Sequence, residues 1–353
     1  MSRPYLIVPQ LIEQPTWGGD YIVGLKGWKN QKALGHKKIG QSYELSGKSL
    51  LATNIISSDD KGLYKPNTTT PLEDVLEADE TMPLLIKLNQ ARGNSFQLHV
   101  KPGQQSGMWK PKPESWYFLE KGYISLGLNL QTSVDEYKKT CQAIEGYMID
   151  LSQQVKDKSL ELSQARSQAQ RFIKEQNPWQ FVNRYSVDQF DLIDLSMGAI
   201  HHSWEEDPDN DVGNIVYEVQ RDVTDDESTM RSFDQGKIKN DGSIREVTID
   251  DYFAHIDTDP EHNTFEYLKR TSDGNTLLKT DYYVLERYEV SGKQPQQTNG
   301  LWHHVYVQNG TIALTGAERT LSISKGHSCF IPSSVDSYVV SSNKAIILVT
   351  HLP

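Results

Sequence analysis

The chain has 353 residues, of which 37% are hydrophobic and 24% charged, a balance typical of a globular protein with one large domain or roughly two ordinary ones. Its net charge of -11 argues against binding a polyanion, so we expect no nucleic-acid partner. Two cysteines are too few for a disulfide framework, and we find neither a signal peptide nor an apolar run of about eighteen residues. We therefore expect a cytoplasmic protein that binds no membrane.

The first hundred residues predict short strands joined by turns. Apolar residues cluster in short runs, and glycine, proline and asparagine stand between them. The predicted strands are Tyr5–Val8, Ile39–Ser46, Leu84–Leu88 and Phe96–Val100.

The last of these strands carries two polar residues that can act together. Gln97 and His99 stand two residues apart, so in a strand their side chains point to the same face. A loop rich in proline and glycine follows, and Glu114 begins the next apolar strand. An amide oxygen, an imidazole and a carboxylate form an incomplete ligand set for a divalent metal. The alternative is that Gln97 is a solvated strand residue, His99 a hydrogen-bonded core histidine and Glu114 a surface charge.

The longest helical pattern runs from about Ser133 to Gln176. Ser133 and Glu136 form a capping box, and Asn177-Pro178 ends the segment. Apolar residues recur along it at spacings of four and three. A straight helix of this length would span roughly 60 Å. We therefore favour two helices folded back near 156–159 and packed on a sheet; a protruding coiled coil is the other option.

The remainder of the chain predicts strands and turns again. Residues 282–352 are almost entirely short alternating strands, which argues for a barrel or sandwich. The acidic run 222–227 is expected to be solvated surface. Gly198-Ala199-Ile200-His201 follows an apolar strand, so a turn can deliver His201 as a further metal ligand. His202 is its immediate neighbour, and the residue type alone does not separate the two histidines.

At this point the chain resembles the type I mannose-6-phosphate isomerases, a family of zinc-dependent cupins. A series of stretches matches that family's motifs in the family's order, although about three residues are inserted between Gln220 and Arg231. The matching stretches are Pro15–Gly19, Ile39–Ser46, Met82–Lys87, Gln97–His99, Lys112–Glu114, Gly198–His201, Tyr217–Gln220 and Arg231–Lys237.

The resemblance implies a mainly β fold of two cupin-type, jelly-roll β-barrels. The first, catalytic barrel would take residues 1–132 and 177–260, with the helical segment 133–176 inserted and packed on it. Residues 261–353 would form the second barrel. We expect this barrel to hold no metal, and we interpret His303 and His304 in it as ordinary strand residues.

The resemblance also implies a site and an activity. One Zn²⁺ per chain would be held by Gln97, His99, Glu114 and His201. The reaction would interconvert mannose 6-phosphate and fructose 6-phosphate, which moves a proton between C1 and C2 through an enediolate. The protein would then work on a small sugar phosphate, as a monomer or homodimer.

Four more residues are candidates for this chemistry. Lys112 flanks Glu114 and could move the proton; the alternative is a solvated loop lysine. Arg231 would stabilise negative charge on the enediolate or phosphate, whereas its alternative is a surface ion pair with nearby aspartates. Lys87 and Glu218 would contact substrate. The competing function is a metal-binding cupin that senses a sugar phosphate or isomerises another sugar.

Overall fold

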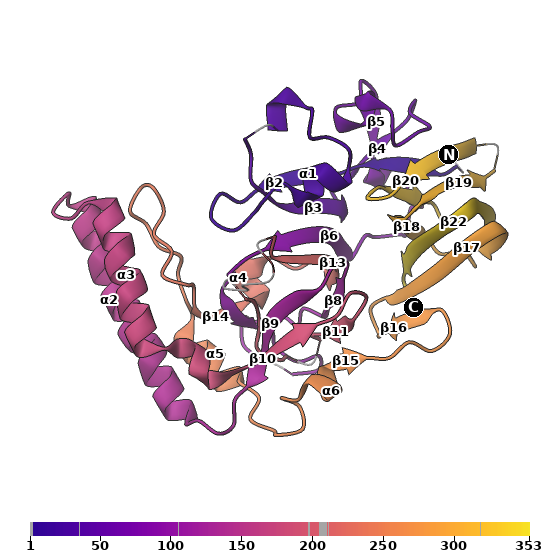
Figure 1. The fold of residues 1–353 in the computed structure, drawn as a ribbon. Coiled ribbons are helices and arrows are strands. Elements are labelled where there is room, and N and C mark those ends of the chain that lie inside the picture. Colours follow the sequence, from indigo (N-terminus) through magenta and orange to yellow (C-terminus); the bar gives the residue numbers. More distant parts are fainter. Residues whose placement is uncertain are drawn as a thin grey trace. The chain divides into compact units, whose positions relative to one another are not determined.

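The computed structural model of the protein describes residues 3–34, 36–104, 106–196, 198–204, 210, 212–317 and 319–353. It is mainly β, with several antiparallel sheets and one long helical hairpin, as predicted (Figure 1). Two compact units make up the fold. Unit 1 takes the described residues of 1–90, 215–222 and 270–353, and unit 2 those of 91–214 and 223–269. The two compact units do not test the predicted barrel boundaries, because a barrel is defined by the closure of its sheet. Those boundaries stay a prediction.

Unit 1 is built on a ten-stranded sheet. Its longest pair runs antiparallel from Val284 opposite His351 to Gln297 opposite Ser337, with a bulge next to Gly292, whose φ is 85°. The strands of this sheet are β1 (Tyr5–Val8), β4 (Leu50–Ala52), β5 (Thr69–Pro71), β16 (Thr276–Lys279), β17 (Val284–Gln297), β18 (His303–Asn309), β19 (Thr311–Gly316), β20 (Arg319–Ser324), β21 (Ser328–Ile331) and β22 (Ser337–His351). The alternating strands predicted near the C-terminus are thereby confirmed.

The N-terminal strand β1 lies in the interior of that sheet. It pairs with β4 on one side and with β21 on the other, and Leu6 stands opposite both Ala52 and Cys329. Residues from the two ends of the chain therefore share one core. Unit 1 further contains β2 (Gln10–Glu13), α1 (Tyr21–Leu25) and β3 (Ile39–Leu45), together with all but one terminal residue of β6 (Leu84–Ala91) and of β13 (Asn214–Arg221).

Unit 2 contains a five-stranded sheet in the order β10-β9-β12-β7-β14. A further pair, β8 with β11, is antiparallel in the same unit. The strands are β7 (Phe96–Leu98), β8 (Glu114–Phe118), β9 (Gly122–Leu128), β10 (Val182–Val187), β11 (Leu192–Asp194), β12 (His201–Ser203) and β14 (Met230–Phe233). The short helices are α4 (Asp225–Ser228), α5 (Ile249–His255) and α6 (Phe265–Leu268), and β15 (Lys269–Arg270) lies where the unit ends.

The helical segment folds back on itself, as predicted. Helices α2 (Val134–Lys156) and α3 (Leu162–Gln176) form a hairpin whose turn includes Lys158 with φ of 59° (Figure 1). Ser133 caps α2 by accepting a hydrogen bond from the backbone N–H of Glu136. The apolar positions of both helices join the buried core of unit 2. The hairpin is thus packed against the sheet rather than free in solution.

In the described part of the chain, no helix is both long enough and apolar enough to cross a membrane.

Candidate metal centre

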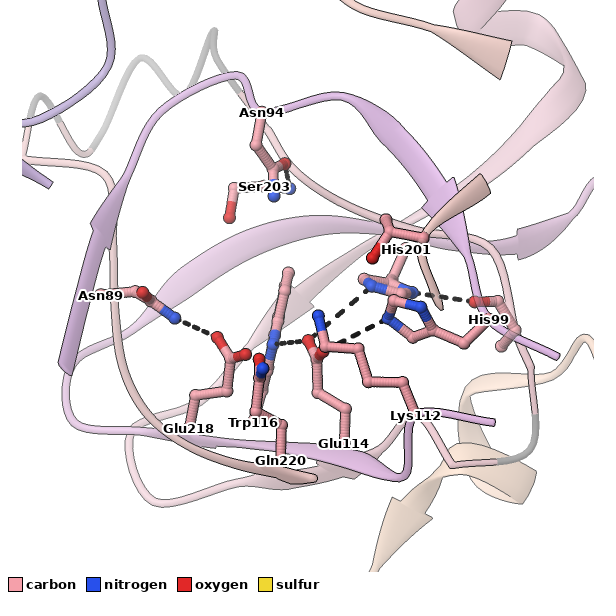
Figure 2. A network of polar contacts seen from close by, with 12 residues as sticks. Asn89, Asn94, His99, Lys112, Glu114, Trp116, His201, Ser203, Glu218 and Gln220 are labelled. Carbon is pink, nitrogen blue, oxygen red and sulfur yellow. Dashed lines mark hydrogen bonds and ion pairs between the residues drawn. The ribbon is translucent and has the colours of Figure 1, made fainter. Parts of the chain in front are cut away.

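Three side chains that are far apart in sequence converge within unit 2. His99 follows β7, Glu114 begins β8 and His201 begins β12, and one potential ligand atom of each lies within 4.8 Å of the other two. All three side chains are buried, at 1%, 2% and 0% exposure. Figure 2 shows the two imidazole rings and the carboxylate turned toward one another. The sequence predicted these three residues as ligands, and the fold brings them together.

Hydrogen bonds set the direction of both imidazole rings. The Nδ1 atom of His99 lies 2.8 Å from the carbonyl oxygen of Ser228, and Nδ1 of His201 lies 2.9 Å from that of Ala199. Because a carbonyl only accepts hydrogen bonds, each Nδ1 carries the proton and each Nε2 keeps a lone pair. The Nε2 atoms lie 3.2 Å and 3.8 Å from the two carboxylate oxygens of Glu114. Three sets of lone pairs therefore face one small space.

This arrangement fits a bound divalent cation. Nε2 of both histidines is buried without a hydrogen-bond partner, which is costly unless a ligand satisfies it. Burial, reinforced by the neighbouring His99, lowers the pKa of His201 to about 3. Burial alone would raise the pKa of Glu114, but Lys112 and the two histidines hold it well below its usual range. A neutral imidazole and an ionised carboxylate are the forms that bind metals.

Two neighbours orient the carboxylate of Glu114. The indole Nε1 of Trp116 donates to Oε1 at 2.7 Å, and the ammonium of Lys112 lies 3.1 Å from Oε2 (Figure 2). The Lys112 side chain is only 5% exposed, so it is not a solvated loop lysine. Trp116 was not predicted as a site residue. Its position two residues after Glu114 in a strand, on the same face, is the signal that could have found it.

Strand pairing places Gln97 among the same residues. On β7, Gln97 stands opposite His201 of β12 on one side and opposite Arg231 of β14 on the other. Directly opposed residues of antiparallel strands point to the same face of a sheet. Gln97 therefore shares a face with His201, as a ligand would. Its role as the fourth ligand stays a prediction.

Arg231 is buried and paired with an aspartate. Its Nη2 lies 2.8 Å from Oδ2 of Asp225, whose Oδ1 lies 3.5 Å from the ammonium of Lys112. Asp225 belongs to the acidic run that we expected to be solvated surface. Its side chain is indeed 60% exposed, yet it bridges two buried cations. The ion pair of Arg231 with a nearby aspartate was the alternative expected from the sequence, but Arg231 is buried rather than on the surface, and the contact of Asp225 with Lys112 was not expected.

The two predicted substrate contacts lie in unit 1. Lys87 on β6 and Glu218 on β13 are buried and form an ion pair of 3.0 Å. Asn89 also donates a hydrogen bond to Glu218 (Figure 2). Their role toward a substrate stays a prediction.

The other histidines have different surroundings. His202 faces away from the cluster, with its ring 4.7 Å from that of Phe96 in the hydrophobic core. His303 and His304 lie on β18, as interpreted, and their Nδ1 atoms contact the hydroxyls of Tyr338 and Tyr217. Among the described residues, the cluster of His99, Glu114 and His201 is the only group of its kind. The absence of metal from the C-terminal barrel stays a prediction.

Gly198 gives a stability test of the turn that delivers His201. Its φ is 77°, and a Cβ added to it would lie 2.8 Å from the carbonyl oxygen of His99. We expect Gly198→Ala to lower the free energy of unfolding by at least about 1–2 kcal/mol, measured by denaturant titration. Gly146→Ala in α2 is the control, because a Cβ there meets no atom within 4 Å and alanine favours the helix. Equal stability of the two variants would contradict a strained turn.

Comparisons with known proteins agree with this structure. Residues 273–351 match the model of the mannose-6-phosphate isomerase cupin domain. A mannosephosphate isomerase homologue from Archaeoglobus fulgidus is 17% identical, with a TM-score of 0.66 over 99% of this chain and 97% of that one. The mannose 6-phosphate isomerase of Bacillus subtilis is 16% identical, with a TM-score of 0.67 over 99% of this chain and 100% of that one.

A third similar structure is a mannose 6-phosphate isomerase bound with zinc and yttrium. It is 12% identical to this chain, with a TM-score of 0.67, and the match covers 100% of both chains. A comparison of the sequence with curated proteins found no match. The resemblance seen in the sequence is confirmed: the chain has the fold of the mannose-6-phosphate isomerases over its whole length, and residues 273–351 match that family's cupin domain.

Proposed function

We propose that the protein is a mannose-6-phosphate isomerase, which interconverts mannose 6-phosphate and fructose 6-phosphate. The observation that carries this proposal is the buried group of His99, Glu114 and His201, with two unpartnered imidazole nitrogens and with Lys112 paired with the carboxylate. The fold that contains this group is shared with isomerases of that name. The cytoplasmic location and the monomeric or homodimeric state stay predictions.

The reaction sets two requirements. A weakly acidic C–H proton must move between C1 and C2, and the negative charge that develops on oxygen must be stabilised. A bound divalent cation, for which we propose one Zn²⁺ per chain, would supply a Lewis acid for the sugar oxygens. Gln97, His99, Glu114 and His201 would hold it, with Trp116 keeping the carboxylate in place.

Lys112 and Arg231 beside the cluster would do the remaining work. Lys112 is buried within 3.1 Å of Glu114, and once its ammonium has given up a proton, the neutral amine would be close enough to the metal ligands to accept and return the proton of the sugar. Arg231 presents a planar guanidinium that can meet two oxygens of a negatively charged group. Lys87 and Glu218 would contact the sugar phosphate.

An assay of turnover with and without metal tests the proposal. We expect fructose 6-phosphate to form from mannose 6-phosphate, to stop forming after chelation and to resume when Zn²⁺ is added back. Glucose 6-phosphate serves as the control substrate and should give far less product. A metal-loaded protein that binds mannose 6-phosphate without converting it would refute isomerase activity and support a sugar-phosphate sensor.

A further inference from the structure

The short acidic segment between β13 and β14 contacts several residues of the candidate site. The carbonyl oxygen of Ser228 accepts the hydrogen bond from His99, and the carboxylate of Asp225 contacts both Lys112 and Arg231. These contacts indicate that the segment acts on the site and is more than solvated surface.

Asp225 is far more exposed than the two cations that it contacts. Its side chain is 60% exposed, whereas the side chains of Lys112 and Arg231 are 5% and 10% exposed. The carboxylate therefore reaches in from the solvent side and covers both charges. Water hydrates the carboxylate when it moves away, so most of the cost of its departure lies in the two buried cations that lose it. An incoming oxyanion that contacts both cations offsets that cost.

Both cations have other contacts that hold them in place. The Nε of Arg231 donates to Ser95 Oγ at 3.2 Å, and its Nη1 donates to the carbonyl oxygen of Thr229 at 3.1 Å. The ammonium of Lys112 also contacts Glu114. If Asp225 moved away, the two positive groups would still face the position that its carboxylate occupies. Two buried cations aimed at one position make a site for an oxyanion.

We propose that Lys112 and Arg231 form an oxyanion site which Asp225 fills in the ligand-free protein, and that an oxyanion of the substrate must displace Asp225 to bind. This inference rests on the proposed function, because a sugar phosphate is the anionic ligand that it invokes. Asp225 neutralises two buried charges while the site is empty, and in return it weakens substrate binding. Asp225 thereby raises the substrate concentration that is needed for half-maximal rate.

Phosphate binding tests this inference without any turnover. We expect Asp225→Asn to bind inorganic phosphate about two- to fivefold more tightly than the wild type, measured by isothermal titration calorimetry on the metal-loaded full chain. Asp226→Asn is the matched control, because it removes the same charge from the adjacent exposed residue. It should bind phosphate as the wild type does. In Asp225→Asn combined with Arg231→Gln, the gain should disappear.

Steady-state kinetics provide a second readout. Asp225→Asn should lower KM for mannose 6-phosphate and leave kcat close to the wild-type value. Asp225→Ala should bind phosphate as tightly as Asp225→Asn, and melting temperatures will show that each variant is folded.

The inference fails if Asp225→Asn and Asp226→Asn bind phosphate equally well. It also fails if Asp225→Asn lowers kcat without tightening phosphate binding, because Asp225 would then be a positioning residue. Tighter phosphate binding in a protein without isomerase activity would uphold the oxyanion site and refute only the proposed function.

Discussion

Replacing His201 with alanine is expected to leave the purified protein almost without metal and without activity. The imidazole Nε2 of His201 is one of two buried, unpartnered imidazole nitrogens in the cluster, and alanine removes it. Changes to residues that merely orient a metal ligand cost about 10- to 100-fold in affinity, so loss of the ligand itself should cost at least about 100-fold. His99→Ala should behave in the same way. Elemental analysis after dialysis against a weak chelator gives the metal content directly.

His202→Ala is the matched control for this experiment. His202 is equally buried and adjacent in sequence, but its ring packs against Phe96 rather than facing the cluster. We expect this variant to lose stability and to keep its metal. Full metal content in His201→Ala together with depleted metal in His202→Ala would show that the wrong histidine had been assigned.

Replacing Lys112 with arginine is expected to lower kcat by about 100- to 10,000-fold while metal binding persists. Arginine keeps the positive charge beside Glu114, but it stays protonated at all accessible pH values and cannot accept a proton. A positioned acid–base group contributes about 100- to 10,000-fold to a rate, which sets the size of the expected loss. A coupled assay for fructose 6-phosphate, with metal content measured in parallel, gives the result.

Lys110→Arg controls for the substitution itself. Lys110 belongs to the same loop, but its side chain is 56% exposed and pairs with Glu227. Its replacement should change kcat by less than about twofold to threefold, since exposed ion pairs contribute little. Lys112→Ala should regain part of its activity when a small primary amine is added. A loss of only a few fold in Lys112→Arg would mean that Lys112 acts through its charge alone.

Local pattern was sufficient to predict much of this site. Gln97 and His99 could be paired because side chains alternate along a strand, and Glu114 because it begins the next one. The helical hairpin was predictable because a straight helix of that length does not fit a compact protein. His201 could be named as a candidate because a turn after an apolar strand can deliver it, but nothing local connects it with a residue about 100 positions earlier, and the family resemblance was needed to place it in the same site.

Contacts between residues that are far apart in the sequence account for the features that could not be predicted. Asp225 stands in a run of acidic residues that usually indicates solvated surface, and only the fold brings its carboxylate to Lys112 and Arg231. The two compact units each take several separate segments of the chain, a division that no shift in composition marks. The order of strands in a sheet depends on which strands pair, and a short alternating run does not specify the strand with which it pairs.

The position of β1 has a consequence for how the protein is made. Leu6 pairs with Cys329, about 320 residues later, and ribosomes add about 5–20 residues per second. For roughly 15–60 s the apolar strand β1 is therefore outside the ribosome without its partner β21. Residues 91–269, which include the metal cluster, are complete before β21 is synthesised. We expect nascent chains to need a chaperone that shields β1 during that interval, and chains truncated before β21 to aggregate through this strand.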